Sequence, residues 1–133
     1  MKEHAFRLVC GDDLKKEMLR YCEKNNVRSA VILCGVGCVS AVCIRKAKAE
    51  TIFRDVNEYE IVALQGTIAN GKAHIHIALS DEKMKTIGGH LMEETIVNTT
   101  AEIILMELQE YVLDREFDEN TGYYELVGIP KDL

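Results

Sequence analysis

The dipeptide Asn70-Gly71 lies between two runs rich in apolar and β-branched residues, 60–68 and 73–79. Both residues tolerate positive φ, and Asn-Gly between two such runs is the strongest short-range indication of a β-hairpin. The two runs therefore predict an antiparallel strand pair. A two- or four-residue loop would place Thr67 opposite His74 and Gln65 opposite His76, whereas a three-residue loop would shift this register.

The rest of the chain also predicts mostly strands, with one or two helices. Asp12 and Asp13 are suited to begin a helix, because the apolar residues from Leu14 to Cys22 recur at helical spacing. Glycines interrupt the apolar runs at Gly35-Val36-Gly37 and Gly88-Gly89, where we expect tight turns. The expected strands cover residues 6–10, 29–34, 39–45, 51–54, 60–68, 73–79 and 123–127. The stretch 95–108 is β-branched at its start, and its second half is compatible with a helix or a strand.

Length and composition favour a single compact domain over residues 1–133, since 47% of the residues are hydrophobic and only one is a proline. The formal net charge of -6 gives no overall attraction for the phosphates of nucleic acids. No apolar run approaches the roughly 20 residues of a membrane helix, and the first residues lack the apolar core of a signal peptide. We therefore expect a cytoplasmic protein with no membrane partner.

Three of the four histidines fall close together, and they are the sharpest functional feature of the sequence. His74 and His76 point to one face of a strand because side chains alternate along it. His90 follows Gly88 and Gly89, which leave room for a close approach of backbone or ligand. Together the three imidazoles predict a site for zinc or another divalent metal, with a fourth position open to water or a small anionic ligand. In the alternative, the histidines are simply polar residues of a half-exposed strand.

Other residues gain candidate roles from this prediction. Gln65 and Thr67 would support the histidines from the neighbouring strand, and Gly88 and Gly89 would line the ligand side. His4, near the terminus, is expected to be unrelated to the site.

The five cysteines form an odd set with no C-x-x-C pair, and most lie in apolar stretches. This usage predicts buried, reduced thiols rather than a disulfide framework. Zinc ligation by Cys34 and Cys38 is an alternative, but no second cysteine pair completes four ligands.

Arg45, Lys46 and Lys48 form the one notable cationic cluster. They are either the solvated end of a strand or a contact to DNA phosphates or a protein partner. A metalloenzyme would also need a general base, for which Asp81, Glu93 and Glu94 are the candidates.

The order of motifs closely resembles the plants-and-prokaryotes-conserved (PPC) domain over nearly the whole chain. The segments that carry the resemblance are 60–66, Gly71-Lys72-Ala73-His74-Ile75-His76, Leu79-Ser80-Asp81, Gly88-Gly89-His90-Leu91 and 100–104. The resemblance implies an α/β fold of the α+β type, with a strongly bent and mostly antiparallel sheet, that assembles as a homotrimer. It also implies metal binding at His74, His76 and His90, as in stand-alone prokaryotic members, which are commonly described as predicted DNA-binding proteins. The Arg-Gly-Arg-Pro hook of the plant members is absent from this sequence.

The sequence predicts two alternative functions. The first is a homotrimeric, regulatory DNA-binding type of module that carries a three-histidine zinc site. The second is a metal-dependent enzyme in which zinc activates water for hydrolysis of a small molecule.

Overall fold

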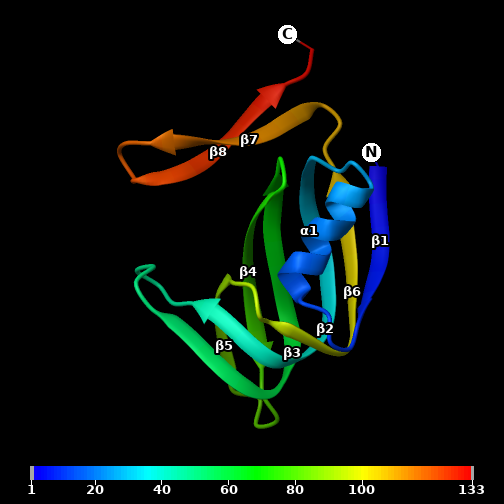
Figure 1. The fold of residues 1–133 in the computed structure, drawn as a ribbon, viewed down its shortest axis with the longest axis vertical. Helices are drawn as coiled ribbons and strands as arrows, with labels where there is room; N and C mark the ends of the chain where they lie inside the picture. Colours follow the sequence, from blue (N-terminus) through cyan, green and yellow to red (C-terminus); the bar gives the residue numbers. More distant parts are fainter. Residues whose placement is uncertain (1, 133) are drawn as a thin grey trace.

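The computed structural model describes residues 2–132 and contains eight strands and one helix in that part of the chain. Six strands form the main sheet in the order β1-β6-β2-β3-β4-β5, and every pairing in it is antiparallel. The elements are β1 (Lys2–Val9), α1 (Leu14–Lys24), β2 (Ser29–Arg45), β3 (Ile52–Ala69), β4 (Lys72–Ser80), β5 (Thr86–Leu91), β6 (Ile96–Glu107), β7 (Tyr111–Asp118) and β8 (Tyr123–Pro130). This arrangement confirms the predicted α+β fold with a bent, antiparallel sheet (Figure 1).

The bend of the sheet comes from its two longest strands, β2 and β3. Both turn sharply near the bottom of Figure 1, so that the last residues of β2 swing round towards the far edge of the sheet. There Ile44 pairs with Leu91 and Arg45 pairs with His90 of β5. The sheet therefore closes partly on itself, and this closure brings β5 between β4 and the end of β2.

Helix α1 covers one face of the sheet. The Asp13 side chain accepts a hydrogen bond from the Lys16 amide at 3.0 Å, which makes it the N-cap that the sequence predicted. Leu14, Met18 and Cys22 on the inner side of the helix are fully buried against the sheet. At 11 residues, this one helix of the described residues is too short to cross a membrane.

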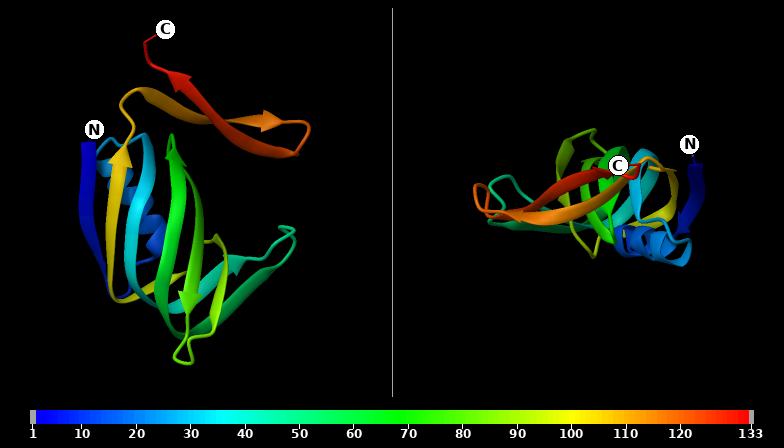
Figure 2. Two further views of the ribbon diagram at one scale, coloured as in Figure 1. Left: turned by 180° about the vertical axis from the view of Figure 1, so that it is seen from behind. Right: turned by 90° about the horizontal axis from the view of Figure 1, so that it is seen from above.

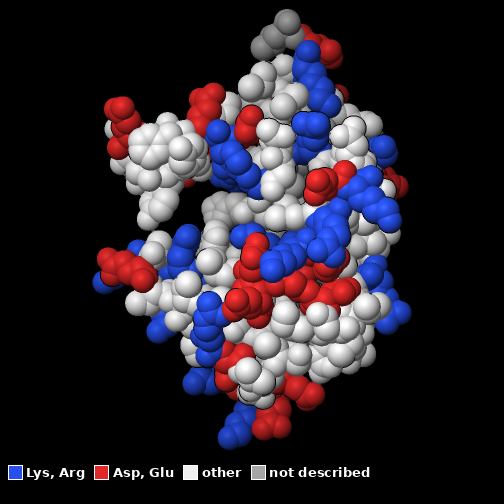
Figure 3. Space-filling view, in the orientation of Figure 1, with Lys and Arg blue, Asp and Glu red and all other residues white. Residues whose placement is uncertain are grey.

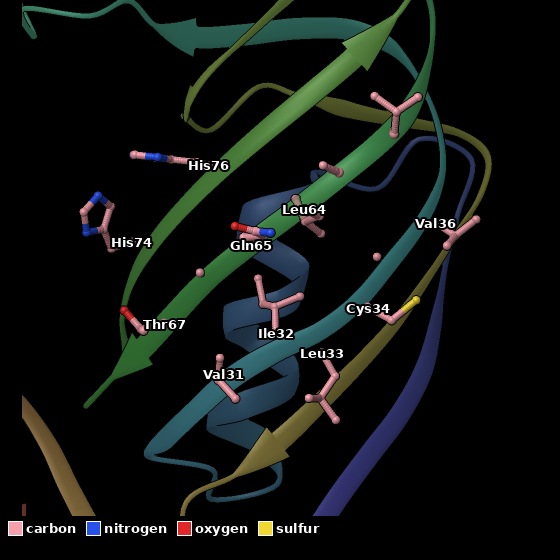
Figure 4. A pocket seen from close by; sticks show the side chains of 14 residues that line it. Val31, Ile32, Leu33, Cys34, Val36, Leu64, Gln65, Thr67, His74 and His76 are labelled. Atoms are coloured by element: carbon pink, nitrogen blue, oxygen red, sulfur yellow. The ribbon is translucent and has the colours of Figure 1, made fainter.

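The opposite face of the sheet has no helix over it. Leu33, Val36 and Val62 lie there with 54%, 51% and 57% of their surface exposed. Figure 4 shows this face from the front, with α1 behind the sheet. The chain thus leaves an apolar surface of its own sheet uncovered, which a single small domain rarely does without a partner.

The β3–β4 hairpin forms in the predicted register. Asn70 and Gly71 take φ values of 48° and 80° and make a two-residue turn between Ala69 and Lys72. As a result, Thr67 faces His74 and Gln65 faces His76. The alternation on β4 buries Ile75, Ile77 and Leu79 on the core side.

The predicted turns at the two glycine pairs are wrong, because both pairs lie inside strands. Gly35 and Gly37 belong to the continuous strand β2, and Gly88 and Gly89 belong to β5. A Cβ atom on Gly35 would lie 2.3 Å from Leu64 Cδ2, and one on Gly37 would lie 2.0 Å from the carbonyl oxygen of Thr100. These glycines permit close packing between strands at the bend, a requirement that a sequence pattern cannot tell apart from a turn. The two strands expected over 29–34 and 39–45 are therefore one strand, β2, and those expected over 51–54 and 60–68 are also one strand, β3.

The last two strands form a separate two-stranded hairpin, β7–β8, which lies across the ends of β2, β3 and β4 (Figure 2). The turn at 120–122 and the strand at 123–127 are as predicted. Two hydrogen bonds attach β7 to the main sheet. The Leu113 amide donates to Ser29 Oγ at 2.9 Å, and Arg115 Nη2 donates to Thr67 Oγ1 at 3.1 Å.

Candidate metal centre

The structure brings His74, His76 and His90 together in one cluster. Each imidazole offers a nitrogen, and these three nitrogens lie within 4.8 Å of one another. The ring centroids are 5.0 Å apart for His74 and His76, 5.2 Å for His74 and His90, and 5.7 Å for His76 and His90. In the described part of the chain, this is the one cluster of histidine, cysteine or acidic residues with spacing suited to a metal ion.

Local structure positions each of the three. His74 and His76 project from the same side of β4, away from the buried Ile75 (Figure 4). His90 lies on β5 directly opposite His76, so it arrives on a strand and not on the turn that we expected. The two neighbouring strands therefore supply the cluster through simple cross-strand register.

Gly88 and Gly89 allow β5 to reach this position. A Cβ atom on Gly89 would lie 2.6 Å from the carbonyl oxygen of Arg45, and one on Gly88 would lie 2.8 Å from that of Ile77. Either contact would push β5 away from its neighbours. The glycines thus act on the site by letting β5 pack between β4 and β2.

Two of the three imidazoles have lowered pKa values. Burial first, and then the charge of Arg45, lowers the pKa of His90 to about 4. Burial is also the main cause that lowers the pKa of His74, followed by the charges of His76, Arg115 and Arg45. Both imidazoles are consequently neutral near pH 7 and keep a lone pair available for a metal ion.

His90 Nδ1 is the decisive atom for testing whether a metal fits. It is buried, and it has no hydrogen-bond partner among residues 2–132. A buried polar atom of this kind is costly unless a ligand satisfies it. Tetrahedral zinc with nitrogen ligands at about 2.0–2.1 Å holds those nitrogens about 3.3 Å apart. The three nitrogens lie within 4.8 Å of one another, so this set of imidazole donors fits a zinc ion with one position open.

Three cavities border the cluster, and two of them are the larger. The first, about 740 Å³, is a shallow groove over the uncovered sheet face that ends at His74, His76, Gln65 and Thr67 (Figure 4). The second, about 510 Å³, lies between His74, His90 and the β7–β8 hairpin. Gln65 and Thr67 hold their predicted places opposite the histidines, but the Thr67 hydroxyl accepts its hydrogen bond from Arg115.

The cationic cluster of the sequence lies beside this site. Arg45 pairs with His90 at the end of β2 and lines the second cavity together with Lys48. Lys46 and Lys48 belong to the loop that joins β2 to β3, and Lys46 lines a further hollow next to His76 and His90. The second cavity is also lined by Arg115, Tyr123, Tyr124 and Glu125, none of which the sequence had suggested. They come from the β7–β8 hairpin, and no local pattern indicates that it folds back over the histidines.

The other candidates lie elsewhere. All five cysteines are free thiols, and Cys38 Sγ donates to the carbonyl oxygen of Asn98 at 2.8 Å. His4 lies between Glu107, at 2.9 Å, and the Tyr21 hydroxyl, at 3.0 Å.

The three general-base candidates have other partners as well. Asp81 accepts hydrogen bonds from the amides of Lys83 and Lys85 in the β4–β5 turn. Glu93 and Glu94 pair with Lys16 and Arg54. None of the three lines the cavities beside the histidines.

Residues 1–109 match the family model of the Plants and Prokaryotes Conserved (PCC) domain, the PPC domain of our prediction. The chain belongs to the PPC domain family. Residues 111–130 of the β7–β8 hairpin follow the part that matches the model.

Similar proteins of known structure share this fold over nearly their whole length. A hypothetical protein from Salmonella enterica is 28% identical, with a TM-score of 0.94 and coverage of 98% of this chain and 94% of that one. A metal-containing protein from Archaeoglobus fulgidus is 25% identical, with a TM-score of 0.80 and coverage of 96% and 94%. A candidate DNA-binding protein from Bacteroides thetaiotaomicron is 18% identical over 94% and 91% of the chains, with a TM-score of 0.84, and supports the fold alone.

A curated relative shows this PPC domain within a longer protein. The bifunctional protein GlmU of Synechococcus sp. (strain JA-3-3Ab) is 34% identical over 126 residues. These residues are 95% of the present chain but 20% of that protein, so the chain spans about a fifth of the relative.

Proposed function

We propose that this PPC domain is a metal-binding module that holds one zinc ion at His74, His76 and His90. The observation that carries the proposal is the buried and unpartnered Nδ1 of His90 within a cluster of three imidazoles. The metal-containing relative from Archaeoglobus fulgidus supports it. When bound, zinc would supply a Lewis-acidic centre with one open position for water or a small anion.

Elemental analysis of untagged protein tests this proposal. We expect about one zinc per chain in the wild type, and less than a tenth of that in His74→Ala, His76→Ala and His90→Ala. His4→Ala is the matched control, because it removes a histidine that lies between Tyr21 and Glu107 and should leave the zinc content unchanged. A wild type that stays free of metal after dialysis against zinc would refute the proposal.

The module is further proposed to act as a homotrimer in the cytoplasm. The uncovered face around Leu33, Val36 and Val62 supports self-association, because water contact with three large apolar side chains on one sheet face is unfavourable. The family resemblance implies the trimer. Reduced thiols at all five cysteines favour the cytoplasm.

Light scattering coupled to gel filtration tests the assembly. The expected mass is about three times the chain mass of 15.0 kDa, and Val36→Glu combined with Val62→Glu should reduce it to that of one chain. Val56→Glu is the control, since Val56 is 87% exposed on the distal part of β3 and lines neither groove nor cavity at the site. A trimeric double variant would exclude this face as the interface.

A regulatory role through DNA is the second part of the proposal, and it rests on Arg45, Lys46 and Lys48. Their clustering at one end of β2 and in the following loop gives a local positive patch on an acidic chain. The alternative of a zinc-dependent hydrolase receives less support, because Asp81, Glu93 and Glu94 all have partners away from the histidines.

A further inference from the structure

The cavity of about 510 Å³ between the histidines and the β7–β8 hairpin has the size of a small-molecule site. The histidines and Arg45 form its floor, and the hairpin supplies its opposite wall through Arg115, Tyr123 and Tyr124. In the space-filling view, a gap opens between the hairpin and the β2–β3 loop at the left of the molecule (Figure 3). The wall belongs to the residues that follow the family match over 1–109.

The charges around this cavity are unbalanced. Arg45, Lys48 and Arg115 line it, against the single carboxylate of Glu125. No carboxylate within residues 2–132 forms an ion pair with any of the three cations. Arg115 uses one nitrogen to donate to Thr67 Oγ1, which fixes its position and leaves its remaining donors available. The net charge of the chain is -6, so this local excess of positive charge is not a general property of the surface.

The tyrosines give the cavity an aromatic side. Tyr123 and Tyr124 lie on β8 at the turn of the hairpin and are 54% and 64% exposed. The Tyr124 ring packs edge-on against Phe117 of β7, with centroids 5.5 Å apart, which holds the ring in place without covering it. Exposed tyrosines that line a cavity provide flat surfaces for stacking with another planar ring.

We infer that this cavity binds a small planar carboxylate, whose anionic group lies between Arg45 and Arg115 at the open position of the histidine site and whose ring packs against Tyr124, which shares a face of the hairpin with Arg115. The guanidinium of Arg115 is suited to a carboxylate because its paired donors match the two oxygens. The metal of the proposed function would add a third positive contact, and to that extent the inference rests on that function. The β7–β8 hairpin is then the part of the chain that selects the ligand.

Calorimetric titration of zinc-loaded protein with benzoate tests the inference. Benzoate is the planar anion, benzamide is its neutral counterpart, and cyclohexanecarboxylate is an anion without an aromatic ring. We expect benzoate to bind at least about tenfold more tightly than either of the other two. Arg115→Gln should weaken benzoate binding at least about tenfold, whereas Arg115→Lys should retain part of it because the charge remains. Tyr124→Ala should weaken benzoate binding and leave cyclohexanecarboxylate almost unaffected.

The controls separate a ligand site from a general loss of structure or metal. Arg20→Gln removes an exposed helix arginine that pairs with Glu17, and Tyr111→Ala removes a tyrosine of the same hairpin that does not line the cavity. Both should bind benzoate as the wild type does. The zinc content of every hairpin variant is measured in parallel and should stay at the wild-type level.

The outcomes distinguish the two proposals. If the protein holds zinc but benzoate binds no better than benzamide, or binds equally well to Arg115→Gln, the inference is overturned and the metal site stands. If the protein holds no zinc, yet benzoate binds in an Arg115-dependent manner, the metal proposal fails and the anion site stands.

Discussion

The substitution Gly89→Ala should lower both the stability of the protein and its affinity for zinc. Gly89 lies on β5 where this strand fits between β4 and the end of β2, and a Cβ atom there would lie 2.6 Å from the carbonyl oxygen of Arg45. Carbon and oxygen atoms in adjacent strands normally stay about 3.3 Å or more apart. β5 must therefore move by about 0.7 Å, or the pairing of β2 with β5 must open.

The loss of stability can be estimated from the contacts that this movement of β5 disturbs. Only two residue pairs, Ile44 with Leu91 and Arg45 with His90, join β2 to β5, and Leu91 is fully buried. Overpacking of a tight site typically costs about 1–3 kcal/mol, which corresponds to a decrease in Tm of about 4–12 °C for a domain of this size. His90 moves with β5, so zinc affinity should fall by about tenfold or more.

Two measurements check this prediction. Thermal unfolding of metal-free protein reports the packing cost, and competition with a chromophoric chelator reports the zinc affinity. Gly128→Ala is the matched control, because a Cβ atom there would meet Tyr111 at an ordinary distance of 3.7 Å. Equal Tm values and equal zinc affinities for the two variants would refute the argument that β5 needs a glycine.

Three further predictions concern acid stability, DNA and thiol reactivity. The pKa of His90 is about 4 in the folded protein against an ordinary 6.5, so the metal-free protein should keep its full stability above pH 6.5 and lose about 1–2 kcal/mol, after allowance for solvent screening, as the pH falls to 4. Urea unfolding at pH 7.5 and at pH 5 should show a smaller difference in the free energy of unfolding for His90→Asn than for the wild type. Equal differences in the two proteins would contradict a role of His90 in the acid sensitivity. If Arg45, Lys46 and Lys48 contact phosphates, the affinity for duplex DNA should fall steeply with salt, and replacing all three by glutamine should abolish most of that slope; binding that ignores salt would exclude the contact. Burial raises the pKa of Cys22 to about 11, so iodoacetamide should modify the exposed Cys10 well before Cys22. Mass spectrometry of partly alkylated protein measures the two reactions, and equal alkylation rates at Cys10 and Cys22 would contradict the prediction.

Local chemistry explains the parts of the molecule that the sequence predicted correctly. Asn70 and Gly71 are neighbours in the chain and accept positive φ, so they alone determine the turn and the register that brings Gln65 and Thr67 opposite His76 and His74. The cap at Asp13 likewise depends on residues within one helical turn. The pairing of His74 and His76 on one face follows from the alternation of a strand, so two of the three proposed ligands could be grouped without any tertiary information.

Long-range contacts decided the rest. Gly35 and Gly89 look like turn residues until the strand packed against each of them is known, because a glycine permits both a turn and a close approach. The position of His90 opposite His76 depends on the register of β4 and β5, and the position of Arg45 beside His90 depends on the closure of the sheet by β2 and β5, which joins residues more than 40 positions apart. The same is true of Arg115, Tyr123 and Tyr124, which reach the histidines only because the β7–β8 hairpin folds back over the end of the sheet. The sequence by itself determined the hairpin, the helix and the set of proposed metal ligands, whereas the tertiary structure decided how the candidate site is closed and which side chains line the cavity beside it, since those contacts join segments that no local pattern connects.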